Sequence, residues 1–137
     1  MNPKTINIIY WSSTILFSLL MIFSAVPNAI ANEDSVKFLH DMLGYPVYFI
    51  PFVGIAKIAG AVIILIPQLN KIKEWGYAGL FFDLAGAVYS GIAVARGIDP
   101  NMLFMLIWII PGILSYYYWN KKKNIIKSRQ EISMQRL

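Results

Sequence analysis

The 137-residue sequence contains no cysteine and a single histidine, His40. Without thiolates, the chain cannot itself hold an iron–sulfur cluster, a thiolate zinc site or a redox-active cysteine pair. One histidine also excludes a haem that is held by two histidines of the same copy. We therefore predict no metal site, and any redox chemistry would require an organic cofactor or a partner subunit.

Charged side chains are scarce too, at 14% against about 25% in soluble domains, while 58% of the residues are hydrophobic. Residues 5–32 and 100–120 carry no formal charge. A helix that crosses the hydrocarbon core of about 30 Å needs roughly 20 apolar residues. The composition excludes an ordinary soluble domain, a disordered chain and a disulfide-stapled module. It predicts an integral membrane protein whose first partner is the lipid bilayer.

Four apolar segments follow one another, and none shows the alternating pattern of a membrane β-barrel strand. We predict an all-α fold, an integral membrane four-helix bundle over residues 1–120, with a basic cytoplasmic tail over residues 121–137. The expected spans are residues 6–29, 46–67, 75–95 and 102–119. The first segment looks like a secretory signal, but its apolar run exceeds the usual core of about 7–15 residues. We expect it to be retained, since cleavage would leave three spans.

Basic residues predict the orientation. Lys4, Lys71, Lys73 and the basic residues after Trp119 fall on one side of the predicted spans, whereas Lys37 and Arg96 fall on the other. Both termini should therefore face the cytoplasm. Tryptophans and tyrosines, among them Trp11, Trp75, Tyr77 and the 116–119 run, lie at predicted span ends, as in an aromatic belt.

Two charged residues lie inside predicted spans, Lys57 in the second and Asp83 in the third. A short connection makes these spans antiparallel neighbours, and both residues then lie at nearly the same depth. A lone charge at mid-membrane costs at least about 2.5–3.5 kcal/mol, so pairing is favoured. Small residues around both charges favour close helix approach. The candidate pocket lining adds Trp11, Thr14, Ser18, Gly54, Gly86 and Ser90.

Two interpretations of the Lys57/Asp83 pair remain open. The pair lines a polar pocket for a ligand or proton, or it is a structural pair that holds two helices in register. His40 and Asp41 lie in the loop at the predicted outer mouth, where His40 is either a solvated side chain or an acid–base group. The position of Glu74 just before Trp75 is explained by the favourable interaction of a carboxylate with the N-terminus of the predicted third helix. The basic tail favours anionic lipid headgroups, and we expect no nucleic-acid partner.

Four blocks of the sequence resemble the DoxX-like family of small bacterial membrane proteins. They are residues 40–46 (His-Asp-Met-Leu-Gly-Tyr-Pro), 54–57 (Gly-Ile-Ala-Lys), 73–79 (Lys-Glu-Trp-Gly-Tyr-Ala-Gly) and 82–87 (Phe-Asp-Leu-Ala-Gly-Ala). Tyr10, Trp11 and Thr14 of the first span fit as well, and the resemblance covers roughly residues 6–118. The motif residues are Gly44, Tyr45, Pro46, Glu74, Trp75, Tyr77 and Gly79. Gly91 departs from the pattern, since many relatives carry histidine there.

The resemblance implies a four-helix protein of the bacterial cytoplasmic (inner) membrane, in a family named after a subunit of a thiosulfate:quinone oxidoreductase. It makes a binding or accessory subunit in quinone-linked redox processes the first hypothesis, with quinone as the candidate cofactor and a redox partner subunit or a second copy as candidate partners. The alternatives are an enzyme subunit that oxidises a sulfur compound, a small proton-coupled transporter, and a structural anchor for a partner protein.

Overall fold

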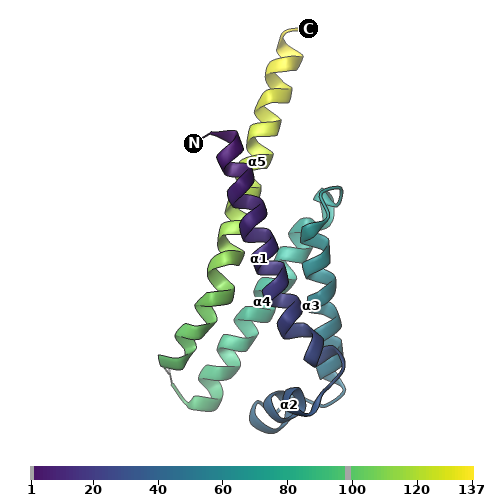
Figure 1. The fold of residues 1–137 in the computed structure, drawn as a ribbon, viewed down its shortest axis with the longest axis vertical. Coiled ribbons are helices and arrows are strands. Elements are labelled where there is room, and N and C mark those ends of the chain that lie inside the picture. Colours follow the sequence, from purple (N-terminus) through teal and green to yellow (C-terminus); the bar gives the residue numbers. More distant parts are fainter. Residues whose placement is uncertain (1, 98–99) are drawn as a thin grey trace.

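The computed structural model describes residues 2–97 and 100–137, and within these ranges the regular secondary structure is entirely helical. Figure 1 shows the long helices α1 (Pro3–Ala29), α3 (Phe49–Leu65), α4 (Asn70–Ala95) and α5 (Leu106–Gln135). The short helices α2 (Glu33–Val36), η1 (Lys37–Met42) and η2 (Pro100–Met105) lie in the connections. The predicted all-α fold class is confirmed.

Three helical segments are long and apolar enough to cross a bilayer: Pro3–Ala29, Asn70–Ala95 and Met102–Gln135. Helix α3 is apolar but has 17 residues, a rise of about 25 Å. It is shorter than the predicted segment 46–67 because the chain is still turning at residues 47–48 and leaves the helix at Ile66. Ile66 is extended because it precedes Pro67, and proline disfavours helical geometry in the residue before it.

Capping side chains set several helix ends. The side chain of Asn2 accepts a hydrogen bond from the amide of Lys4 at 3.0 Å, and Pro3 occupies the first helical position of α1. Asn32 caps α2 in the same way through the amide of Ser35 at 2.8 Å. Helix α4 ends where Arg96 adopts a left-handed conformation, with φ of 55°.

Three helices extend beyond their predicted spans, and α1 does so by three residues at its start. Helix α4 begins at Asn70, more than a turn before the predicted start at Trp75. Helix α5 continues through the predicted tail to Gln135, because residues 120–135 contain neither glycine nor proline and include many good helix formers. The tail is therefore helical and continuous with the preceding apolar segment.

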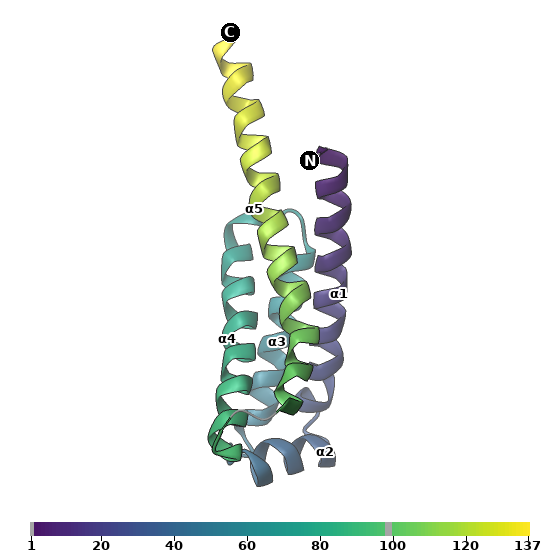
Figure 2. The same cartoon turned by 90° about the vertical axis from the view of Figure 1, so that its left-hand side faces the viewer.

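The long helices lie side by side along the long axis of the molecule (Figure 2). Helix α1 packs against both α3 and α5, α4 packs against α3, and α4 and α5 touch over a smaller area. Both termini lie at one end of the molecule, together with the turn between α3 and α4, whereas α2 and η1 lie across the opposite end (Figure 1). The final turns of α5 project beyond the other helices.

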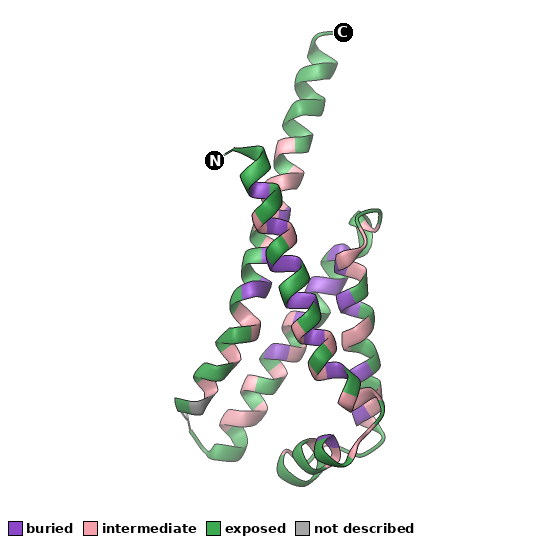
Figure 3. Ribbon diagram, viewed as in Figure 1, coloured by how far each residue is buried: buried purple, intermediate pink, exposed green. Residues whose placement is uncertain are grey.

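Buried residues gather along the inner faces of these helices, and the outward faces are exposed (Figure 3). The core residues are Tyr10, Phe17 and Met21 of α1, Ala61 and Ile64 of α3, Tyr77, Leu80 and Leu84 of α4, and Trp119 of α5. The outer face of α4 carries Trp75, Phe82 and Tyr89 at seven-residue spacing, all more than 70% exposed. Large apolar side chains on an outward face suit contact with lipid.

Helices α1 and α3 approach each other closely at Gly54. A Cβ atom at this position would lie 2.7 Å from the Ala29 Cα atom and 2.8 Å from the Ala25 carbonyl oxygen. Both atoms belong to the backbone and cannot rotate away. Gly60 and Gly76 form a second close approach, between α3 and α4, where a Cβ on Gly76 would lie 3.3 Å from the Gly60 carbonyl oxygen. Small residues at these points allow neighbouring backbones to meet.

We expect Gly54→Ala to lower the free energy of unfolding by about 1–3 kcal/mol, because α1 and α3 must separate to admit the methyl group. Gly79→Ala is the matched control, since a Cβ there meets no atom within 4 Å and alanine is the better helix former. Unfolding of the purified chain in detergent, followed by circular dichroism, measures both. Equal stability of the two variants would contradict the close approach.

Candidate functional site

Lys57 and Asp83 form an ion pair between α3 and α4, with 3.4 Å between Lys57 Nζ and Asp83 Oδ2. Lys57 is the central residue of α3, and Asp83 lies near the centre of α4. The side chains are 11% and 22% exposed. Each charge thus has its partner at mid-helix, where an unpaired charge would be most costly. An ammonium and a carboxylate at this distance can hold two helices together or exchange a proton.

The residues predicted to line a pocket with this pair are distributed over several helix contacts. Thr14 bonds Ser115 of α5 rather than the ion pair, and Ser18 donates to the Ala61 carbonyl oxygen at 3.4 Å. Gly54 lies in the contact with α1, whereas a Cβ on Gly86 or on Gly79 would meet open space. Trp11 lies beneath the ammonium of Lys122, and Trp75 is exposed.

The predicted outer mouth is a small hydrogen-bonded loop. His40 Nδ1 lies 2.7 Å from the Tyr45 carbonyl oxygen, and the Tyr45 hydroxyl lies 2.6 Å from Ser90 Oγ on α4. Gly44 has φ of 80°, a conformation that favours glycine, and lets the chain turn towards Pro46. Asp41 is exposed. These contacts give His40, Tyr45 and Ser90 a role in attaching the loop to α4.

A buried cluster of hydroxyl groups joins three helices. Ser115 Oγ of α5 lies 2.6 Å from Thr14 Oγ1 of α1 and 2.6 Å from the Tyr77 hydroxyl of α4. All three side chains are at most 1% exposed. A hydroxyl can donate one hydrogen bond and accept two, so Ser115 can serve both neighbours at once.

Lys73 lies beside this cluster and is 2% exposed. Its ammonium donates to the Tyr10 hydroxyl at 2.9 Å and lies 5.6 Å from the centroid of the Tyr10 ring and 5.9 Å from that of Trp119. The ion pairs of the described residues are Lys57–Asp83 and Lys123–Glu74, and Lys73 belongs to neither. Aromatic rings and one phenol therefore stabilise this buried charge.

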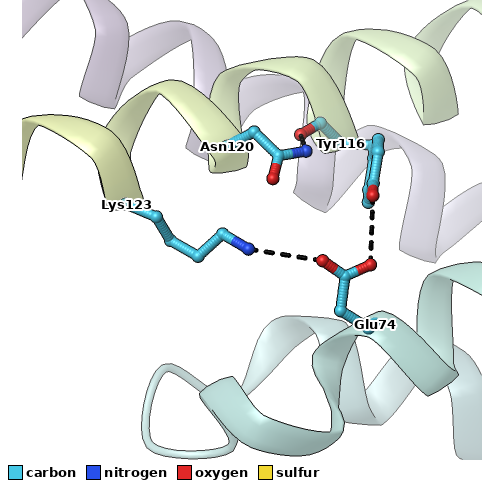
Figure 4. A network of polar contacts seen from close by, with 4 residues as sticks. All are labelled: Glu74, Tyr116, Asn120 and Lys123. Carbon is cyan, nitrogen blue, oxygen red and sulfur yellow. Dashed lines mark hydrogen bonds and ion pairs between the residues drawn. The ribbon is translucent and has the colours of Figure 1, made fainter.

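Glu74 binds α5 instead of capping its own helix. Because α4 begins at Asn70, Glu74 lies beyond the first turn, and the predicted role at a helix N-terminus is wrong. Its carboxylate accepts a hydrogen bond from the Tyr116 hydroxyl at 3.0 Å and pairs with Lys123 at 3.3 Å (Figure 4). The Asn120 amide donates to the Tyr116 carbonyl oxygen at 3.1 Å and stays within α5.

Sequence reasoning assigned no site role to Tyr10, Lys73, Ser115 or Lys122. The sequence does contain a pattern that groups some of these residues with the hydroxyl cluster. Tyr10 and Thr14 are four residues apart and share a helix face, as do Lys73 and Tyr77. Trp119 was predicted to lie in an aromatic belt, but it is 3% exposed and stacks on Tyr77.

An apolar groove of about 410 Å³ lies between α4 and α5, with most of its lining residues on α4 and Ile109 on α5. It is lined by Phe81, Leu84, Ala85, Val88, Tyr89, Ile92 and Ile109. Tyr89 is the one lining residue with a polar side-chain atom, the other lining side chains are hydrocarbon, and the surface of the groove is almost entirely apolar. A groove of this size and composition suits a lipophilic molecule with few polar atoms. Across residues 2–97 and 100–137, no three His, Asp or Glu side chains gather into a metal site.

Comparison with known proteins gives one match. The DoxX-like family matches the chain over residues 12–114, which include the ion pair, the apolar groove and, from the hydroxyl cluster, Thr14 and Tyr77 but not Ser115. No curated protein and no solved structure matches. Together with the apolar helices, the family match supports a membrane protein in contact with lipid.

The ion pair generates a prediction about stability. Lys57→Met or Asp83→Leu alone should lower the free energy of unfolding by about 3 kcal/mol, because each leaves an unpaired charge at mid-helix. The double variant leaves no charge there, so its free energy of unfolding should recover to within about 1 kcal/mol of wild type. Lys123→Ala is the control, since its pair with Glu74 is about half exposed and contributes less than about 1 kcal/mol. Denaturation in detergent measures all four. A double variant as unstable as the two single variants combined would show that the charges do not depend on each other.

Proposed function

Because the chain belongs to the DoxX-like family, we propose that it crosses the bacterial cytoplasmic membrane four times, with both termini in the cytoplasm. Helix α3 is the shortest span, but it packs along α1 and α4, which are both long enough to cross. Both termini lie at one end of the molecule, as an even number of crossings requires (Figure 1). Most of the basic residues lie towards that end, which favours the cytoplasm. Helix α1 is retained as the first span, since Phe17, Met21 and Ala25 are fully buried.

The function that we propose is a binding or accessory subunit that holds a small hydrophobic molecule in the α4/α5 groove, with a quinone as the leading class. The observation that carries this proposal is the apolar groove itself, which opens at the contact between two membrane-length helices. A quinone needs hydrocarbon walls for its tail and ring, and a donor for a carbonyl oxygen. The Tyr89 hydroxyl is that donor, and electrons would come from a redox partner subunit because the chain has no thiol.

We assign the Lys57/Asp83 pair a structural part in this subunit. Neither residue lines the α4/α5 groove, and each already has its partner across the α3/α4 contact. The pair therefore holds α4 at a fixed height against α3, which keeps the groove-lining face of α4 towards α5.

The proposed topology can be tested because the natural chain has no cysteine, so a single introduced cysteine reports one position. We expect a membrane-impermeant maleimide to label Asp34→Cys from the outside of intact spheroplasts. Gln68→Cys, in the turn between α3 and α4, and Ser128→Cys, in α5, should be labelled only after lysis. Labelling of Gln68→Cys from outside would show that α3 does not cross.

The quinone proposal predicts that a decyl-substituted benzoquinone binds the chain in nanodiscs, measured by native mass spectrometry. Ala85→Phe should fill the groove and weaken binding at least about tenfold, and Tyr89→Phe should weaken it about fivefold through one lost hydrogen bond. Ala87→Phe is the control, because Ala87 is exposed on the same helix and does not line the groove. No binding to wild type, or equal binding to Ala85→Phe, would contradict the proposal.

The same preparation separates the alternatives. Thiosulfate-dependent quinone reduction by the purified chain alone would indicate an enzyme rather than an accessory subunit. Proton-driven uptake into sealed vesicles that Asp83→Asn abolishes would indicate a transporter. A folded chain that shows neither activity and binds no quinone would leave a structural anchor.

A further inference from the structure

Positive charge gathers where α1, α4 and α5 meet near the termini. Lys73 and Lys122 lie against the same aromatic ring, with their ammonium nitrogens 5.6 and 4.4 Å from the centroid of Tyr10. Lys123 lies 3.8 Å from the centroid of Trp119, and Glu74, the carboxylate at this corner, pairs with Lys123. Lys73 and Lys122 thus repel each other, and no ion pair of the described residues includes either. An anion at this corner would relieve that repulsion.

A groove of about 130 Å³ lies beside this corner, between the first turns of α1 and the polar part of α5. Its lining includes Pro3, Ile6, Asn7, Lys122, Ile125 and Arg129. Two cations and one amide therefore face the same space as apolar side chains. The first turns of α1 contain no acidic residue, and α5 contains none before Glu131.

The depth of the groove matches the headgroup layer of a bilayer. In the proposed topology, Trp11 marks the edge of the hydrocarbon on α1, since tryptophan prefers the interface, and the end of the uncharged run at Asn120 marks it on α5. Asn7 lies four residues before Trp11, and Lys122 two residues after Asn120, which places them about 6 Å and about 3 Å beyond that edge. The headgroup layer of each leaflet is about 5–8 Å thick. Arg129 lies about two helical turns further out on α5 and lines the same groove.

We propose that this groove binds one anionic phospholipid of the cytoplasmic leaflet, with the phosphate between Lys122 and Arg129 and the upper acyl chain against the isoleucines. Charge complementarity selects an anion, and the adjoining apolar lining selects one that carries hydrocarbon. A free phosphate would leave the apolar side of the groove unused. The inference rests on the proposed membrane placement, but it is independent of the quinone site, which lies in a different groove with different lining residues.

The test uses the full chain in neutral detergent micelles, which needs no assumption about sidedness. Native mass spectrometry follows titration with phosphatidylglycerol and with phosphatidylcholine of the same acyl chains. Wild type should bind phosphatidylglycerol about 30-fold more tightly, the effect expected of two basic residues near a headgroup with a net negative charge, since choline neutralises the phosphate of phosphatidylcholine. In Lys122→Gln/Arg129→Gln, this preference should fall to less than about threefold.

Lys127→Gln/Arg136→Gln is the matched control, since it removes the same charge from α5 and its C-terminal cap at positions outside the groove. It should keep the wild-type preference. Arg129→Gln alone, at an exposed position remote from the core, should lose part of the preference with an unchanged circular dichroism spectrum, so a folding defect at Lys122 cannot mimic the result.

Three results would overturn the proposal. Equal loss in the control variant would show that the whole basic helix attracts anions without a defined site. Equal binding of the two lipids by wild type would show that the headgroup charge is not recognised. Displacement of phosphatidylglycerol by excess inorganic phosphate would show that the groove binds the free anion. None of these results bears on quinone binding, which Ala85→Phe tests separately.

Discussion

The structure depends on one constraint: polar groups buried between apolar helices must find hydrogen-bond partners within the protein, either on their own helix, as Ser13 does, or on a neighbouring one. Among the described residues, every buried side-chain nitrogen and oxygen has a hydrogen-bond partner. The partners form a set of links, one or more for each main helix contact. Lys57–Asp83 joins α3 to α4, Thr14–Ser115 joins α1 to α5, and Ser18 joins α1 to α3. Such links set the height and rotation of each helix, whereas apolar packing alone would tolerate sliding.

Two buried lysines have different kinds of partner, and the difference follows from how deep each would lie in the proposed membrane placement. Lys57 lies at the centre of its helix and is paired with a carboxylate. Lys73 lies near the start of α4 and is held by a phenol and the faces of two aromatic rings. A charge near the membrane edge costs less than one at the centre, so the weaker attraction of aromatic rings suffices. The surplus charge at this end is the basis for the proposed lipid site.

Sequence reasoning predicted the features that follow from hydrophobic length and depth. The helical class, the approximate helix positions and the family all follow from apolar runs and short motifs. Equal depth also brought Lys57 and Asp83 together as candidates, although it could not predict their 3.4 Å separation. Contacts that depend on helix rotation were not predictable. Thr14 was grouped with the charged pair but faces α5, and Trp119 was placed at the lipid interface but is buried against Tyr77.

Helix α5 is one unbroken rod of 30 residues, roughly 45 Å long, that contributes Ile109 to one groove and Arg129 to the other. Near its beginning lies Pro111, which cannot donate the backbone hydrogen bond of a regular helix. A tilt of about 5° at that point would displace the far end, about 36 Å away, by about 3 Å. In the proposed membrane placement, a small change of direction at Pro111 would therefore move the aqueous end of α5 further than its apolar end.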